Sequence, residues 1–323
     1  MRIILFASGE FAIPTTRWLA NSPHEVAAVV SQPSRPQGRG RQPAATPAAR
    51  LAAELDMPVL ECADVNEPGF VERVRRMDAR LGIVIAFGQK LRGDVRNAIR
   101  CGCVNLHGSL LPKYRGAAPI AWAILCGEEK TGVTVFRLAD RMDAGEILVR
   151  RETIIRPDET VGELHDRLAM IGPDAIAAAL RLFEEDDAPR GEPQDERCAS
   201  IAPKLSKAAG RIDFRRDAIK LVRHIRAMWP WPGARCTFRP ADGRHAEEVT
   251  LARARLADRK IELAGGETGL ILDGYDVQAG RGAIEILEIQ PRGGRVMSWR
   301  DFINGRHVKP GDRFESLPSE STT

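Results

Sequence analysis

The chain has 323 residues, of which 43% are hydrophobic and 28% charged, and its formal net charge is +4. This length favours two compact domains over one, and the composition excludes a disordered, fibrous or disulfide-rich secreted protein. The apolar runs are shorter than the roughly 18 residues of a membrane-spanning helix, and the opening stretch Met1–Phe6 is too short for a signal peptide.

The first 150 residues alternate short apolar runs with amphipathic stretches, a pattern typical of βαβ units around a mainly parallel sheet. We predict strands at Arg2–Ala7, Glu25–Ser31, Gly82–Phe87 and Cys103–His107. Between them we predict helices around Phe11–Leu19, Pro47–Leu55, Glu67–Met77 and Asp94–Arg100. The alternation in Gly132–Leu138 predicts a further strand, half-buried and beyond the central sheet.

The stretch Gln32–Pro43 carries Arg35, Arg39 and Arg41 and no acidic residue, and its Gly and Pro content predicts an exposed loop. Two interpretations of this arginine loop stay open on composition. It is either a solubilising excursion between a strand and a helix, or a segment that becomes ordered on phosphate groups, which guanidinium forks match well.

No G-x-G-x-x-G follows the first predicted strand, and no phosphate-binding G-x-x-x-x-G-K-[ST] occurs in the sequence. A dinucleotide or nucleoside triphosphate cofactor is therefore disfavoured. In an open parallel sheet the ligand site still lies at the carboxyl ends of the strands, and the segment Asn105–Pro112 falls there.

That segment joins an amide and an imidazole two residues apart. On an extended backbone, Asn105 and His107 leave the same face and can converge on one oxygen atom. Asp143, further along the chain, supplies a carboxylate that could hold the imidazole. Taken singly, Asn105 reads as a strand-end cap, His107 as a satisfied buried histidine and Asp143 as a turn former. Together they indicate acyl transfer.

A long helix is predicted over Thr160–Glu185, and the aperiodic, polar stretch Asp186–Lys207 reads as a linker. Beyond it we predict an amphipathic helix, Phe214–Met228, followed by short strand-like runs such as Glu248–Leu251, Leu270–Ile271 and Ala283–Ile289. These runs favour a small β-barrel. The predicted domains are residues 1–185 and 208–323, joined by 186–207.

Charge and cysteines add two expectations. Residues 208–323 hold 20 Lys and Arg against 16 Asp and Glu, so the whole positive excess lies there, which is compatible with a polyanionic partner. The six cysteines are scattered, and Cys101 and Cys103 with His107 lack the spacing of a zinc site. We expect reduced thiols, a cytoplasmic location and no bound metal.

Several segments resemble the methionyl-tRNA formyltransferase family, and the resemblance covers almost the whole chain. The segments that carry it are Glu10–Pro14, Arg35–Gly40, Ala86–Gln89, Gly108–Ile120, Ile225–Ala234, Asp301–Gly305 and Lys309–Asp312. The chain departs from the family at Ala7-Ser8-Gly9, where Gly-Thr-Pro is usual, at Ala121 in place of a glutamine, and at Met142 and Ala144 on either side of the retained Asp143.

The resemblance implies an α/β protein with a formyltransferase-type, Rossmann-like parallel-sheet domain and a smaller C-terminal OB-like β-barrel. It implies transfer of the formyl group of 10-formyltetrahydrofolate to the α-amino group of methionyl-initiator-tRNA, without a metal. Three alternatives stay open: an amino-sugar formyltransferase, a 10-formyltetrahydrofolate hydrolase, and a folate- or RNA-binding protein that has lost catalysis. We expect a monomer that does not bind membranes.

The resemblance also implies roles for individual residues. Asn105 would donate to the developing oxyanion, His107 would donate to the same oxygen or shuttle the proton, and Asp143 would orient the imidazole. The folate donor would contact Ser109, Leu110, Leu111 and Pro112. The acceptor tRNA would contact Arg35, Arg39, Arg41 and Lys207. For Arg226, Trp229 and Trp231 tRNA contact is an alternative, and for the two tryptophans we favour packing at a domain junction.

Overall fold

The computed structural model describes residues 1–37, 42–258 and 267–317. The chain forms two compact units built from non-contiguous segments. The N-terminal unit contains Met1–Pro119, Lys130–Ile154 and His165–Ala202, and the C-terminal unit contains Ile120–Glu129, Ile155–Leu164 and Pro203–Thr323. Within the described ranges, no helix combines the length and the apolar character needed to cross a bilayer.

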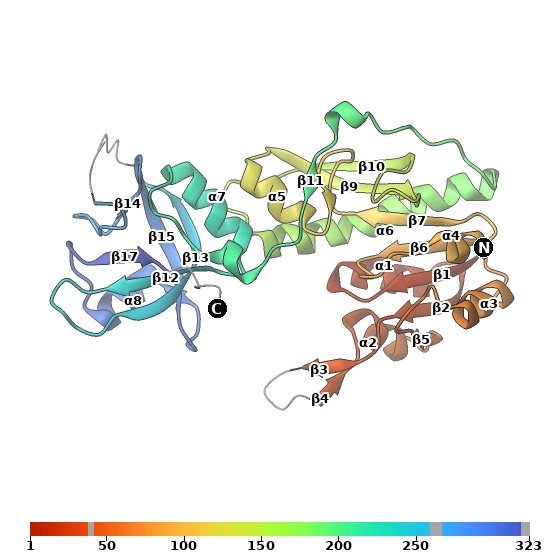
Figure 1. Ribbon diagram of the computed structural model, residues 1–323, viewed down its shortest axis with the longest axis horizontal. Coiled ribbons are helices and arrows are strands. Elements are labelled where there is room, and N and C mark those ends of the chain that lie inside the picture. The colour runs from red at the N-terminus through yellow and green to blue at the C-terminus, as the bar shows by residue number, and fades with distance from the viewer. Residues whose placement is uncertain (38–41, 259–266, 318–323) are drawn as a thin grey trace. The chain divides into compact units, whose positions relative to one another are not determined.

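The N-terminal unit is built on a seven-stranded sheet (Figure 1). Its strands in spatial order are β10 (Ile147–Ile154), β9 (Lys130–Arg137), β7 (Cys103–His107), β6 (Leu81–Ile85), β1 (Arg2–Ala7), β2 (Glu25–Ser31) and β5 (Val59–Glu61). Strands β5, β2, β1, β6 and β7 are parallel, β9 is antiparallel to β7, and β10 is antiparallel to β9. The strand order reverses between β1 and β6, where open sheets of this kind bind ligands.

Helices cover both faces of this sheet. They are α1 (Ile13–Ala20), α2 (Pro47–Glu54), α3 (Pro68–Arg76), α4 (Gly93–Asn97) and most of α6 (Val161–Glu185). One apolar cluster joins Phe6 of β1 and Val84 of β6 with Val74 of α3 and Val95 of α4. On the other face α6 packs closely, since a Cβ on its Gly172 would lie 2.8 Å from the Leu106 side chain of β7. The sheet is thereby buried on both sides, as parallel sheets are.

The predicted strands and most of the predicted helices of this unit are confirmed. The prediction for Gly132–Leu138 is wrong in one respect, because β9 lies inside the sheet between β7 and β10, and its residues Thr131–Phe136 are buried on both faces. Strand β10 was not predicted, because it is an edge strand whose central residues Arg150, Arg151 and Glu152 are charged. Edge strands commonly carry such charges.

The stretch predicted as a linker has defined structure. Up to Ala202 it belongs to the N-terminal unit, where β11 (Ile201–Ala202) pairs in parallel with β8 (Arg115–Gly116). A short 3₁₀ turn, Glu196–Cys198, precedes this strand. The residues just after the candidate active-site strand are therefore held by a segment almost ninety positions further along the chain.

The C-terminal unit is an antiparallel, nearly closed barrel of the OB type. Its strands in spatial order are β14 (Val277–Gln278), β15 (Ala283–Pro291), β13 (Glu247–Leu256), β12 (Ala234–Arg239) and β17 (Arg313–Ser316), with β16 (Met297–Ser298) also paired to β15. The segment Gly269–Ile271 bonds to both edges, because the Phe314 amide donates to the Gly269 carbonyl at 2.7 Å and the Gly269 amide donates to the Gln278 carbonyl at 2.8 Å. The predicted run Leu270–Ile271 is thus the closure of the barrel.

In the described part of the C-terminal unit the barrel is accompanied by helices α5 (Pro119–Cys126), which starts at the end of an N-terminal-unit segment, α7 (Ala218–Met228) and α8 (Trp299–Arg306). Helices α5 and α8 were not predicted. Phe238 of β12 packs edge-to-face on Phe302 of α8, with ring centroids 5.3 Å apart, and also lies against Phe314. All three rings are buried and therefore belong to this unit's core.

Two arginines hold the segment Ile155–Leu164 in the C-terminal unit. Arg226 donates to the carbonyl groups of Glu159 and Arg156, both at 2.9 Å, and Arg253 pairs with Glu163 at 2.6 Å. Burial lowers the pKa of Arg226. Because its guanidinium is buried and bonded to protein, Arg226 is unsuited to contact tRNA. Trp231 is 53% exposed and Trp229 is partly buried, and their packing at a domain junction stays a prediction.

We predict that His224 makes the stability of the C-terminal unit depend on pH. His224 is buried on α7 with no partner for its Nε2 atom, and burial, followed by the nearby positive charge of Arg216, lowers its pKa to about 4. Below pH 6.5 His224 is protonated in the unfolded chain, whereas in the folded chain it stays neutral down to about pH 4. The free energy of unfolding therefore falls as the pH drops from 6.5 to about 4. The full effect is about 3 kcal/mol, at about 1.4 kcal/mol per pKa unit.

Urea unfolding of the whole chain at pH 7.5 and 4.5 tests this, with tryptophan fluorescence as the probe. His224→Gln should lose less stability than the wild type between the two pH values. His245→Gln, which alters an exposed histidine of the same unit, should behave as the wild type does. Equal pH dependence in all three proteins would contradict the prediction.

Candidate active site

The candidate site begins at the carboxyl end of β7. Leu106 points to the α6 face, so Asn105 and His107 leave the opposite face of the strand. Their Cα atoms are about 6.6 Å apart on an extended strand. Across the ladder, Asn105 lies opposite Phe136 and His107 opposite Thr134, both on β9. Asn105 is half-buried, and His107 is buried at the end of the strand.

A backbone carbonyl fixes the His107 ring. The Nε2 atom lies 2.9 Å from the Tyr114 carbonyl oxygen, which can only accept, so Nε2 carries the proton and donates it. The Phe136 ring meets the imidazole edge-on, with centroids 6.3 Å apart. In the neutral ring the lone pair is therefore on Nδ1, at the side of the ring that faces Asp143.

Asp143 sits in the loop after β9, with a left-handed backbone (φ +50°). Its Oδ2 atom accepts a hydrogen bond from the Gly116 amide at 2.8 Å and lies 3.9 Å from Nδ1 of His107. This is an ion-pair distance for a charged imidazole, but it exceeds a hydrogen bond. The group that orients the imidazole is therefore the Tyr114 carbonyl, and not Asp143 as the sequence suggested.

The structure thus brings Asp143 and His107 together across more than thirty positions of sequence. The Nδ1 lone pair and the Asp143 carboxylate face one another. Both are hydrogen-bond acceptors, so they cannot form a hydrogen bond with each other. Such a pair can bind a donor placed between them, for example an N–H group, or can take up one proton jointly. The Asn105 side chain, on the same face of β7, adds an uncharged hydrogen-bond donor.

The turn after β7 is held by Thr134 of the neighbouring strand β9. The Thr134 hydroxyl donates to the Ser109 carbonyl at 2.6 Å and accepts from the Leu111 amide at 3.1 Å, and the Ser109 hydroxyl donates to the Lys113 carbonyl at 2.7 Å. Ser109 is fully buried and Leu111 lies in a core cluster with Phe136. Of the four residues predicted to bind folate, only Leu110 and Pro112 have partly exposed side chains.

A second polar cluster holds the Asp143 loop and was missed in the sequence. Arg115, only 4% exposed, bonds through its guanidinium to Gln194 and Glu196. The Gln194 amide in turn donates to the carbonyls of Asp143 at 2.9 Å and Gly145 at 2.8 Å. Hydrogen bonds from Arg115, then Arg141, lower the pKa of Glu196. Arg115 lies within the segment Gly108–Ile120 that carries the family resemblance, but nothing in the sequence marks Gln194.

The predicted tRNA-binding residues are only partly described. Arg35, on the short strand β3 (Arg35–Gln37) that pairs with β4 (Gln42–Ala44), donates to the Gln32 side chain at 2.9 Å. The Gln32 amide donates to the Phe87 carbonyl at 2.9 Å, beyond the end of β6. Arg39 and Arg41 lie outside the described residues. Lys207, in the C-terminal unit, is exposed at the start of a 3₁₀ turn.

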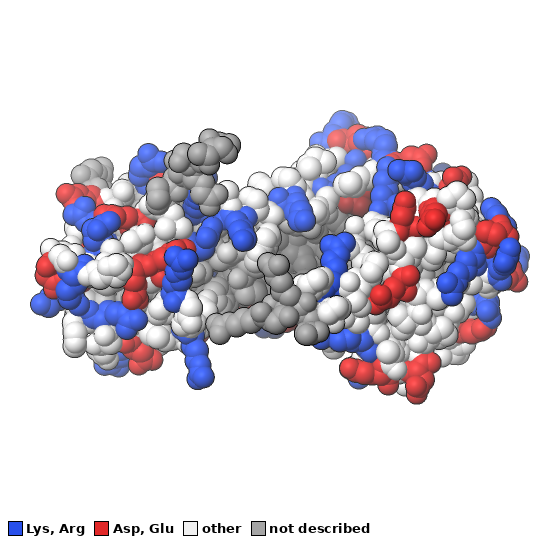
Figure 2. All heavy atoms as spheres, turned by 60° about the horizontal axis from the view of Figure 1, so that its bottom comes forward, with Lys and Arg blue, Asp and Glu red and all other residues white. Residues whose placement is uncertain are grey.

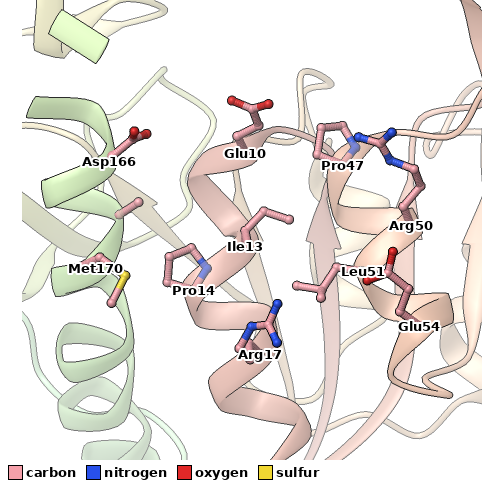
Figure 3. Close-up of a pocket in the computed structure, with 11 residues that line it drawn as sticks. Glu10, Ile13, Pro14, Arg17, Pro47, Arg50, Leu51, Glu54, Asp166 and Met170 are labelled. Atoms are coloured by element: carbon pink, nitrogen blue, oxygen red, sulfur yellow. The ribbon is translucent and has the colours of Figure 1, made fainter. Parts of the chain in front are cut away.

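The N-terminal unit also has a groove of about 530 Å³ between α1, α2 and α6. Figure 3 shows Ile13, Pro14 and Leu51 along it, with Arg17 and Arg50 beside them. None of Asn105, His107 and Asp143 lines this groove. Because it holds neither an imidazole nor a side-chain amide, we assign the chemistry to the end of β7.

In the described part of the chain, no group of three or more His, Cys, Asp or Glu side chains is arranged to hold a metal ion. Cys101 and Cys103 are buried, and burial raises the pKa of the Cys103 thiol to about 12. A thiol with so high a pKa stays protonated, so it behaves as a small apolar group and not as a ligand or nucleophile.

Sequence comparisons decide between the families that carry this kind of site. A family model described as formyl transferase matches residues 1–180, and one described as formyl transferase, C-terminal domain, matches residues 204–307. The methionyl-tRNA formyltransferase of Methylococcus capsulatus is 41% identical over 317 residues, which are 97% of this chain and 99% of that protein. The chain belongs to the methionyl-tRNA formyltransferase family.

Solved structures agree with the fold of the family. HypX from Aquifex aeolicus, in complex with tetrahydrofolic acid, matches with a TM-score of 0.57 at 19% identity, over 94% of this chain and 46% of HypX. The N-formyltransferase of Helicobacter canadensis, in complex with folinic acid and dTDP-3-aminofucose, matches with a TM-score of 0.59 at 14% identity, over 88% of this chain and 97% of that one. At these identities the likeness concerns the fold alone.

We predict that Gly116→Ala disrupts the support of Asp143. Gly116 has φ +124°, and a Cβ there would lie 2.7 Å from the Ala202 carbonyl oxygen, so the chain must move and the amide that bonds to Asp143 moves with it. The expected loss is about 2–3 kcal/mol in the free energy of unfolding. Gly102→Ala is the matched control, since Gly102 also has positive φ (+70°) but open space around a Cβ. Equal losses in urea unfolding would contradict this account.

Proposed function

We propose that the protein transfers the formyl group of 10-formyltetrahydrofolate to the α-amino group of methionyl-initiator-tRNA, giving N-formylmethionyl-tRNA for translation initiation. One observation carries the proposal. The His107 imidazole and the Asp143 carboxylate lie 3.9 Å apart at the end of β7, with Asn105 two positions before His107 on the same strand, in a chain that is 41% identical over nearly its whole length to a methionyl-tRNA formyltransferase.

The Asn105 amide serves the first half of the reaction. When the amine attacks the formyl carbon, a new C–N bond forms and negative charge develops on the formyl oxygen. An uncharged, fixed donor aimed at that oxygen typically stabilises the transition state by about 2.7–4 kcal/mol. Asn105 is suited to this role because its strand position is fixed by both neighbouring strands.

His107 and Asp143 serve the second half. The attacking nitrogen must lose a proton, and the folate nitrogen that leaves must gain one. With Nε2 engaged by Tyr114, the free Nδ1 and the Asp143 carboxylate are the two acceptors that can bind the amine and take its proton. Returning that proton to the leaving nitrogen restores the site for the next turnover.

We propose that the formyl donor lies against the turn Ser109–Pro112. The buried Ser109 and Leu111 give the turn its shape through Thr134, and the partly exposed Leu110 and Pro112 offer apolar surface to the donor. The donor is a substrate that supplies the formyl group, and we assign no metal to the reaction.

For the acceptor, we propose that Arg35, Arg39, Arg41 and Lys207 bind tRNA phosphates. We propose that residues 1–185 carry the chemistry and that the barrel, residues 208–323, binds tRNA, the two being joined by 186–207. The matches of separate family models to residues 1–180 and 204–307 support this division. On the face that Figure 2 shows, Lys and Arg are interspersed with Asp and Glu.

We further propose that the protein acts as a monomer in the cytoplasm. All three residues of the candidate site come from one unit of a single chain, so the site needs no second copy. An amino-sugar formyltransferase would use the same three residues without the arginine loop or the basic barrel. A hydrolase would release formate without any acceptor.

We expect formylation of charged initiator tRNA by the wild type, with no product from uncharged tRNA. Asn105→Ala should lower kcat on the order of 10²–10³-fold because the oxyanion loses its donor, and Asp143→Ala should lower it similarly. Binding of tRNA should change little. Asp166→Ala, which removes an exposed carboxylate beside the α1–α2–α6 groove, is the control and should retain full turnover.

These assays separate the alternatives. Formylation of an amino sugar but not of methionyl-tRNA, or formate release that tRNA does not affect, would refute the proposed function. Full turnover by Asn105→Ala would remove the oxyanion role while leaving the function in place.

We expect Arg39→Ala/Arg41→Ala to weaken tRNA binding at moderate salt with little change in the rate of formyl transfer from bound substrates. Loss of two phosphate contacts should reduce the slope of log K against log salt by about 2. Arg75→Ala/Arg76→Ala, on α3, removes the same charge elsewhere and is the control. An unchanged slope for the loop variant, or the same change in both, would contradict a specific role for the loop.

A further inference from the structure

The segment after α6 reaches back into the candidate active site through one side chain, Gln194. Its two amide hydrogens donate to the carbonyl oxygens of Asp143 and Gly145, at 2.9 and 2.8 Å. Its oxygen accepts from Nε and Nη2 of Arg115, at 3.0 and 2.8 Å. All four bonds lie within the N-terminal unit.

These contacts require an amide at position 194. The guanidinium can only donate and the two carbonyls can only accept, so the side-chain oxygen must face Arg115 and the nitrogen must face the loop. A carboxylate would keep the bonds to Arg115, lose both donors, and bring its negative charge against two carbonyl oxygens. A shorter or apolar side chain would leave the buried guanidinium without one of its acceptors.

The loop that contains Asp143 and Gly145 needs contacts from outside the loop to keep its conformation. Asp143 has a positive φ, which non-glycine residues adopt at a cost of about 1–2 kcal/mol, and its side chain is fixed by the single bond from the Gly116 amide. Gly145 is tightly packed, since a Cβ there would lie 1.7 Å from the Arg137 carbonyl oxygen. By donating to the carbonyls of both residues, Gln194 fixes the loop backbone and so sets the direction in which the Asp143 side chain leaves it.

Arg115 completes the clamp. Its guanidinium is held by Gln194 on one side and by both oxygens of Glu196 on the other, at 3.0 and 3.1 Å. The next residue, Gly116, supplies the amide that bonds to Oδ2 of Asp143. The Arg115 side chain therefore holds the backbone of the Asp143 loop indirectly, through Gln194. The amide of the next residue, Gly116, bonds directly to the Asp143 carboxylate.

We propose that Gln194 is a positioning residue for catalysis, which holds the Asp143 carboxylate at its distance from Nδ1 of His107. The Gln194 side chain is bonded to Arg115 and to the carbonyls of Asp143 and Gly145, so we assign it no contact with either substrate. This inference rests on the proposed function, because it concerns the carboxylate that accepts the amine's proton there. It also makes the segment around Gln194 part of the catalytic machinery and not only a connection to the barrel.

The test compares Gln194→Glu with the wild type in full-length protein, using methionyl-tRNA and 10-formyltetrahydrofolate. We expect kcat to fall about 10–100-fold, because misplacing a reacting group by about 1 Å can cost about 100-fold in rate. The KM values for both substrates should stay within about threefold, because no binding contact is lost. Asp195→Asn is the matched control in the same segment, since Asp195 pairs locally with Arg197 and Asn retains an oxygen to cap the turn.

A double-mutant cycle separates positioning from general destabilisation. If Gln194 acts through Asp143, then Gln194→Glu should cause no further loss of kcat in an Asp143→Ala background. The same fold-loss in both backgrounds would overturn the inference, as would an unchanged kcat in Gln194→Glu, or a rise in KM that accounts for the whole effect. Wild-type protein without formylation activity would refute the proposed function instead, so the two failures are distinguishable.

Discussion

The hydrogen bond from His107 Nε2 to the Tyr114 carbonyl determines what the rest of the site can do. It assigns the ring proton and leaves Nδ1 as an acceptor in front of Asp143. Tyr114 is itself held in place by the chain around it. Its amide donates to the Ser200 hydroxyl at 2.9 Å, and the next residue, Arg115, pairs with β11. The tautomer of the imidazole therefore depends on a segment that the chain reaches only after α6.

Local periodicity predicted the elements that are buried in regular layers. The apolar runs of β1, β2, β6 and β7 sit in a covered parallel sheet, and the two-residue spacing of Asn105 and His107 placed them correctly on one face of β7. Periodicity could not predict Gln194, because its four bonds are made by an irregular segment to partners 49–79 positions away. Asp143 was predicted as a carboxylate that could hold the imidazole and is retained in the family resemblance. The backbone carbonyl that bonds to His107 was missed, because a backbone carbonyl has no signature in sequence.

The same limit explains how the chain is divided. Polar, aperiodic composition suggested a linker at 186–207, whereas the compact units also exchange segments near residues 120–129 and 155–164. These segments are fixed by individual polar contacts, such as those of Arg226 and Arg253 with the backbone and side chains of Ile155–Leu164. A buried guanidinium group needs hydrogen-bond acceptors in defined positions. It therefore stabilises only the chain arrangement that supplies them. Hydrophobic pattern alone gives no sign of them.

The geometry at the end of β7 also indicates where acceptor choice is made. In the proposed reaction, Asn105, His107 and Asp143 would address only the reacting atoms, namely an oxygen, a nitrogen and a proton, which are common to amino sugars and aminoacyl-tRNA alike. Selection must then come from surfaces that contact the remainder of the acceptor, a role that we propose for the arginine loop and the barrel. Arginine contacts to phosphate supply affinity that is independent of sequence, because every tRNA offers the same backbone. Discrimination of the initiator therefore requires contacts to bases or to local helix shape, in addition to the proposed cation contacts to phosphates.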